Sequence, residues 1–146
     1  MKRISKLFFV SLFLSPAIIW GQASLTAIGT AYTQNFDGMG SAGTTTPANW
    51  YVGTGAAASS TTVTVGTGSS SSGGNYNFGS SGAADRALGS LCSSSTLRNT
   101  EVRFINNTGA TINSIDILYD GEQWRLGQTA SNETGLVLYY SSDGTN

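Results

Sequence analysis

Histidine is absent from the 146 residues, and cysteine occurs once, as Cys92. Without imidazole the chain cannot form a Ser-His-Asp or Cys-His nucleophilic site, nor a zinc site that relies on histidine. A single cysteine cannot form a disulfide within the chain. We expect Cys92 to be a small buried apolar residue, with a bridge to a second molecule as the alternative.

Charged residues are scarce as well. They make up 10% of the sequence, against roughly a quarter in average soluble domains. Both lysines fall within the first six residues, and the sequence after residue 23 holds four arginines and eight carboxylates, a formal net charge of −4. The phosphate backbone of a nucleic acid would find no basic stripe here, which excludes nucleic acid as a partner of this domain.

Residues 1–23 have the layout of a secretory signal peptide. Three basic residues precede an apolar run over residues 7–20, and small residues follow at Gly21 and Ala23. The run is shorter than the ~20 residues that cross a bilayer, so it predicts cleavage after Gly21 or after Ala23, with an uncleaved anchor or buried helix as the alternative. We expect an exported protein, secreted or at the cell surface, with no membrane span in the mature chain.

Residues 24–146 predict one all-β domain. Short runs of alternating apolar and polar residues are separated by glycine-rich turns, and no helical periodicity appears after the signal peptide. The expected fold is an antiparallel β-sandwich of the jelly-roll or concanavalin-like kind. Strands are expected within residues 24–36, 50–51, 62–65 and 101–104, and loops at 56–60 and 66–74.

An Asp-Gly pair at positions 120–121 predicts a hairpin. A two-residue turn there places Ile117 opposite Trp124 on one face. The same register places Asp116 opposite Arg125 on the other face, so apolar and charged residues agree on one pairing.

The last predicted strand covers residues 136–140, where both faces are apolar. This pattern is typical of a strand in the centre of a sheet. A further Asp-Gly turn begins at positions 143–144, just before the sequence stops at residue 146. We therefore expect the sandwich to be incomplete at its C-terminus and the sequence to be a fragment of a longer protein.

Four short motifs follow one another along the sequence: YTQNFD at 32–37, NYNFG at 75–79, DRALGS at 85–90 and GEQWR at 121–125. As a set they resemble an N-terminal module of large secreted or surface-sorted bacterial proteins, over roughly residues 30–140. The resemblance implies a jelly-roll or concanavalin-like sandwich, and it implies further domains in the same chain. It brings no activity and no catalytic residue.

Paired carboxylates are the catalytic arrangement that the composition leaves open, because glycoside hydrolysis needs only an acid and a second carboxylate. The candidates are Asp116, Asp120 and Glu122. The predicted hairpin turns Asp116 away from Glu122, so we assign no catalytic residue. A cofactor is not required. Calcium is the one metal considered, with Asp37 and Asp85 as candidate ligands, against a simpler role as turn residues.

Aromatic residues suggest a binding site, because sugar-binding sandwiches present exposed rings to pyranose faces. The candidates are Trp50, Tyr51 and Tyr76. Trp50 and Tyr51 are adjacent, so a strand would place their rings on opposite faces, and one of them is expected to be exposed. Trp124 is expected in the core.

Two functions follow from these observations. The first is a non-catalytic extracellular module that binds a glycan or a surface polymer. The second is a structural spacer or interaction domain that displays other domains of the same chain. A carboxylate-based glycoside hydrolase is a more distant alternative.

Overall fold

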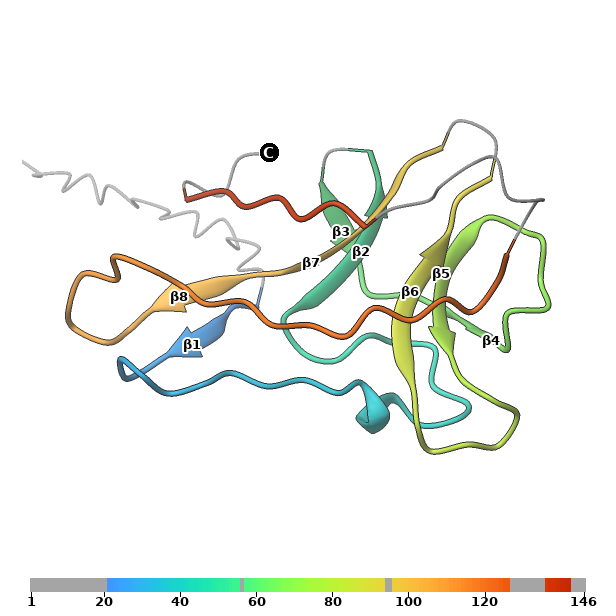
Figure 1. Cartoon of the computed structure of the whole chain (residues 1–146), viewed down its shortest axis with the longest axis horizontal. Helices are drawn as coiled ribbons and strands as arrows, with labels where there is room; N and C mark the ends of the chain where they lie inside the picture. Colours follow the sequence, from blue (N-terminus) through green and yellow to red (C-terminus); the bar gives the residue numbers. More distant parts are fainter. Residues whose placement is uncertain (1–20, 56, 94–95, 127–135, 143–146) are drawn as a thin grey trace, which may run out of the picture.

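The computed structural model describes residues 21–55, 57–93, 96–126 and 136–142, so residues 1–20 of the expected signal peptide lie outside the described part. Within these ranges the chain forms eight short strands and a single 3-10 turn, η1 (Asp37–Met39). The strands are arranged in two three-stranded sheets and one two-stranded sheet (Figure 1). The all-β prediction is confirmed.

The first sheet has the order β3-β2-β7 and is antiparallel throughout. Its central strand, β2 (Trp50–Thr54), begins at the predicted aromatic pair, and its outer strands are β3 (Ala58–Ser60) and β7 (Arg98–Val102). The register shifts between Val52 and Gly53, where a side chain at position 53 would press on the backbone of β3. The loop prediction for residues 56–60 was therefore wrong at residues 58–60, which form β3 and pair with β2.

Arg103 connects all three strands of this sheet. Its guanidinium lies over the Tyr51 ring of β2, with 4.8 Å between the guanidinium carbon and the ring centroid. One of its amino groups donates to the Ala58 carbonyl of β3 at 2.8 Å, and it forms an ion pair with Glu101 of β7. The Glu101 carboxylate also accepts a hydrogen bond from the Ala58 amide. These side-chain contacts stabilise the pairing of the short strand β3 with the rest of the sheet.

The second sheet has the order β4-β5-β6. Strand β5 (Gly74–Phe78) is antiparallel to β6 (Ala87–Leu91) and parallel to β4 (Thr64–Gly66). β4 overlaps the predicted strand at 62–65, while both ends of the loop predicted over 66–74, Gly66 and Gly74, belong to strands. Gly89 faces Phe78 so closely that a side chain there would meet the Phe78 ring at about 3.1 Å. The ring therefore packs down on β6 because position 89 carries no side chain.

The third sheet pairs β1 (Ala23–Leu25) with β8 (Phe104–Asn106) in parallel. β1 covers only the start of the strand expected over residues 24–36. Contacts between β6 and β7 place the two three-stranded sheets next to each other, an arrangement consistent with a sandwich. The jelly-roll connectivity stays a prediction. Among the described residues, the buried apolar ones are Ala23, Met39, Tyr51, Val52, Ala58, Val63, Tyr76 and Phe78.

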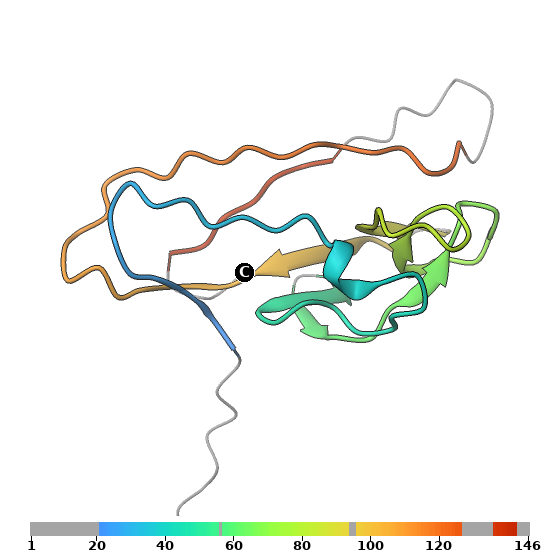
Figure 2. The ribbon, with the colours of Figure 1, turned by 90° about the horizontal axis from the view of Figure 1, so that it is seen from below.

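The hairpin predicted at positions 120–121 is not formed. Residues 111–126 contain no strand, and Figure 2 shows this segment as an extended run along one side of the molecule. A two-residue type I′ turn needs a positive φ at both central positions. The φ of Gly121, the second of these positions, is not positive. Arg125 donates to the backbone carbonyls of Gly68 and Ser69 instead of pairing with Asp116.

Trp124 does not face Ile117 either. Its ring stacks on Phe78, with 6.0 Å between centroids and 5° between planes, so this half-buried residue extends the aromatic stack of β5.

The strand predicted at residues 136–140 is also absent. All five residues are exposed, and the structure assigns them no strand. An apolar pattern on both faces favours a central strand only where neighbouring strands cover it, and no described strand pairs with this segment. The Asp-Gly pair at 143–144 lies outside the described residues.

Candidate functional site

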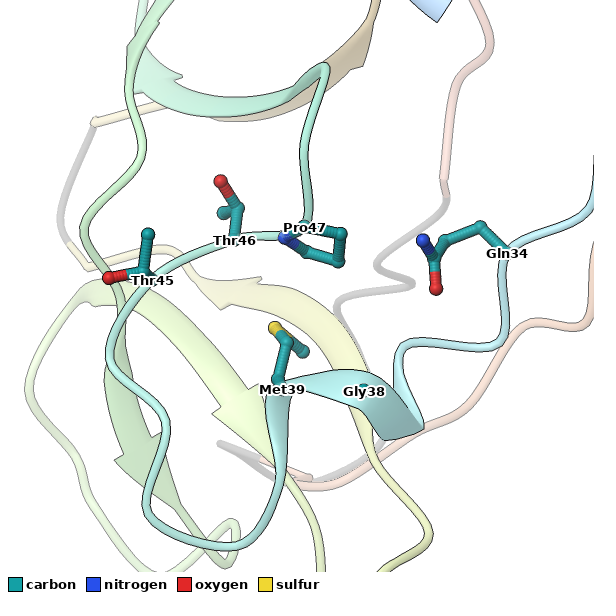
Figure 3. A pocket seen from close by; sticks show the side chains of 6 residues that line it. All are labelled: Gln34, Gly38, Met39, Thr45, Thr46 and Pro47. Carbon is teal, nitrogen blue, oxygen red and sulfur yellow. The ribbon is translucent and has the colours of Figure 1, made fainter.

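A small pocket lies between the loop that contains η1 and the loop that leads into β2. Its volume is about 170 Å³, and Figure 3 shows the six residues that line it. None of them carries a charge. They are Gln34, Gly38, Met39, Thr45, Thr46 and Pro47. We call this the 34–47 pocket. A larger hollow of about 470 Å³ is lined only by four consecutive residues, 117–120, of the extended segment.

Asn77 holds one wall of the 34–47 pocket in place. This residue of β5 is fully buried, and its amide nitrogen donates to the carbonyls of Gly40 and Gly43, each at 2.9 Å. These two carbonyls belong to the loop that follows η1. The loop is thus tied to the second sheet from within the core.

Arg86 completes this anchor. It is only 3% exposed, and its Nε donates to the Asn77 side-chain oxygen at 2.7 Å. A terminal amino group donates to the Asn77 backbone carbonyl at 2.6 Å, and the Arg86 backbone amide donates to an Asp37 carboxylate oxygen at 2.9 Å. The buried charge is therefore surrounded by oxygen acceptors. We call Asn77 and Arg86 the buried polar pair.

The turn that leads into η1 fixes Gln34. Phe36 has a φ of 66°, which is unusual for a bulky residue, and its backbone amide donates to the Gln34 side-chain oxygen at 2.8 Å. In Figure 3 the Gln34 amide points toward the space between Met39 and Pro47. Its oxygen accepts from the Phe36 amide, and its NH₂ group, the donor of this side chain, can donate to a bound molecule.

Trp50 lies beside the 34–47 pocket and is half-buried. Its indole N–H donates to the Tyr32 hydroxyl at 3.0 Å, and its ring meets Phe36 edge-on with 4.8 Å between centroids. The Thr46 hydroxyl donates to the Trp50 carbonyl at 2.6 Å, which links the pocket to the first residue of β2. Tyr32 remains 37% exposed.

The other two aromatic candidates lie in the core. Tyr51 is buried, with its ring under Arg103 and its hydroxyl on the Gly21 carbonyl at 2.9 Å. Tyr76 is buried, stacks on Phe78 and donates its hydroxyl to the Ser72 carbonyl at 2.6 Å. Neither ring presents a free face to solvent. The structure therefore does not bring the three predicted aromatic residues together at one surface.

The structure brings the backbone next to Asp85 close to the side chain of Asp37, the other candidate calcium ligand. The Asp37 carboxylate accepts a hydrogen bond from the backbone amide of Arg86, the residue that follows Asp85. However, both carboxylate oxygens of Asp37 accept hydrogen bonds, one of them from the Asn35 amide at 2.8 Å. Among the described residues, no group of three or more acidic, Cys or His side chains could hold a metal ion.

The three carboxylates considered for hydrolysis lie exposed on the extended segment. Glu122 accepts a hydrogen bond from the Trp124 indole N–H at 2.8 Å. The ion pair predicted between Asp116 and Arg125 was wrong, because Arg125 bonds the loop after β4.

Cys92 is exposed at the end of β6, which corrects the expectation that it is buried. β6 ends at Leu91, which pairs with Gly74 of β5, so Cys92 follows the last paired residue of the strand.

No helix in the described ranges has the length and apolar character that a membrane crossing needs. Comparisons with protein-family models, with curated proteins and with solved structures found no match.

Sequence reasoning missed Gln34, Met39 and Pro47 as pocket residues. The NFD turn and the glycines at 38, 40 and 43 indicated a loop. The wall opposite Gln34 depends on Asn77, which lies more than thirty residues away in the sequence. No local pattern could have revealed that contact.

Proposed function

We propose that this chain is a non-catalytic module of an exported bacterial protein and that it binds a neutral glycan in the 34–47 pocket. The observation that carries the proposal is the uncharged lining, which combines one directed amide donor with apolar surface. Sugars offer the matching chemistry, because they combine hydroxyl oxygens with apolar C–H faces.

The volume favours a small ligand group. Pockets for drug-sized ligands measure about 300–1,000 Å³, and the 34–47 pocket is smaller, at about 170 Å³. We therefore expect one sugar unit of a chain to enter, with a C–H face against Met39 and Pro47. The Gln34 NH₂ group would donate to one of its hydroxyl oxygens.

The walls are fixed before a ligand arrives. The buried polar pair holds the loop after η1, and the Phe36 amide holds the Gln34 side chain. A site that does not need to be ordered on binding loses less conformational entropy, which supports recognition by a small contact area.

Replacing Gln34 with alanine should weaken glycan binding about 5- to 10-fold, which corresponds to one neutral hydrogen bond of about 1 kcal/mol. The measurement is isothermal titration with the tightest oligosaccharide found on a glycan array. Gln123→Ala removes an exposed amide outside the pocket and is the matched control. Equal losses in both variants would contradict a site at Gln34.

A structural spacer is the second candidate, and the burial of Tyr51 and Tyr76 supports it. In that case the domain uses its aromatic residues to build a core that separates other domains of the same chain. The absence of binding to any glycan or surface polymer would favour the spacer over the binding module.

A further inference from the structure

Ala23 belongs to the folded domain. Its side chain is 3% exposed, and its amide donates to the Arg103 carbonyl at 2.7 Å. It is the first residue of β1 and pairs with Phe104 of β8. Gln22, immediately before it, is exposed. The ordered contacts of β1 therefore begin at Ala23.

The rest of β1 is held as firmly. The Leu25 carbonyl accepts the Asn107 amide at 2.8 Å, and the Ser24 hydroxyl accepts the Asn107 side-chain amide at 2.7 Å. The whole pairing of β1 with β8 comprises three residues. A chain that began at Ser24 would lose one of these three positions together with its buried methyl group.

The sequence leaves two cleavage positions, after Gly21 and after Ala23, and the fold distinguishes them. Cleavage after Gly21 removes the bond from the Tyr51 hydroxyl to the Gly21 carbonyl. Cleavage after Ala23 removes the same bond and also the Ala23 amide bond and its burial. The earlier position leaves β1 complete.

We propose that the signal peptide is removed between Gly21 and Gln22 and that the new N-terminal glutamine cyclises to pyroglutamate. This inference rests on the export included in the proposed function. It identifies Gln22 as a modification site, and its exposure leaves room for the ring at the start of the domain.

The chemistry needs only water and the chain itself. Hydrolysis breaks the Gly21–Gln22 peptide bond, and water supplies the carboxylate oxygen of Gly21 and a proton to the new α-amine. The α-amine nitrogen of Gln22 then attacks its own side-chain amide carbon. A new C–N bond closes a five-membered lactam, and ammonia leaves. The product has no charged N-terminal amine.

The test is expression of the complete 146-residue chain in a secreting bacterium, followed by mass spectrometry of the N-terminal peptide. We expect protein in the medium that begins at residue 22 and is lighter than the uncyclised form by one ammonia. A medium form that begins at Ser24, or at an uncyclised Gln22, would overturn the inference and leave export intact. Protein found only inside the cell with Met1 would overturn both proposals.

Gln22→Ala is the matched variant, because it leaves Gly21 before the cleavage position unchanged and cannot form the lactam. Stepwise N-terminal sequencing should be blocked for the natural protein and should read alanine, alanine, serine for the variant. A natural protein that sequences freely, or a variant that begins with serine, contradicts the proposal.

Discussion

Replacing Asn77 with alanine is expected to lower the free energy of unfolding by about 3–5 kcal/mol. Asn77 is fully buried and supplies three side-chain hydrogen bonds, two to the loop after η1 and one from Arg86. Its removal leaves the Arg86 Nε buried without that acceptor. A domain with a total stability of about 5–15 kcal/mol would lose a large share of it.

Urea unfolding of the exported protein measures this loss. Asn113→Ala is the control, because Asn113 is exposed, and it should change the unfolding free energy by less than about 0.5 kcal/mol. Arg86→Ala should cost a similar amount to Asn77→Ala, and the double variant should cost much less than the sum of the two, because both remove one network. Additive losses would contradict the coupling of the buried polar pair.

Replacing Tyr76 with alanine is expected to lower the unfolding free energy by about 3–5 kcal/mol, the range for large aromatic residues in cores. The ring is 4% exposed and stacks on Phe78 with 5.0 Å between centroids. Tyr76→Phe keeps the ring and loses the hydroxyl, which donates to the Ser72 carbonyl and also lies within hydrogen-bond distance of the Ser70 hydroxyl, so it should cost about 0.5–1.5 kcal/mol.

Thermal or urea unfolding of both variants checks this prediction, with Tyr119→Ala as the control at an exposed tyrosine. The order of stability should be natural protein, then Tyr76→Phe, then Tyr76→Ala. A fully stable Tyr76→Ala variant that no longer binds glycan would show that Tyr76 is a ligand contact and would contradict its place in the core.

Local patterns predicted those parts of the fold that depend on neighbouring residues. The aromatic pair at positions 50–51 begins β2, and Val63 is buried just before β4, as its alternation with threonines indicated. The hairpin at 120–121 failed although its apolar and charged patterns agreed. Such a pattern shows which residues are able to pair, while pairing itself needs a turn conformation that Gly121 does not adopt.

The candidate site also has one part that depends on neighbouring residues and another part that depends on residues far apart in the sequence. The contacts that set Gln34 and Asp37 span two residues each, so the turn before η1 follows from the local sequence. The opposite wall is fixed by the contacts of Asn77 with the carbonyls of Gly43 and Gly40, which precede it by 34 and 37 positions in the sequence. A buried arginine was also unforeseeable, because its compensation comes from carbonyl and amide oxygens, which have no sequence signature.

The most direct test of the glycan-binding proposal is an NMR titration of the exported, ¹⁵N-labelled protein with neutral oligosaccharides of glucose, mannose and N-acetylglucosamine. Binding in the 34–47 pocket predicts saturable shifts of the backbone amides of residues 34–46 and of the Gln34 side-chain amide, with the exposed residues 115–120 unchanged. Shifts centred on residues 115–120, or no shift with any of these sugars, would contradict it.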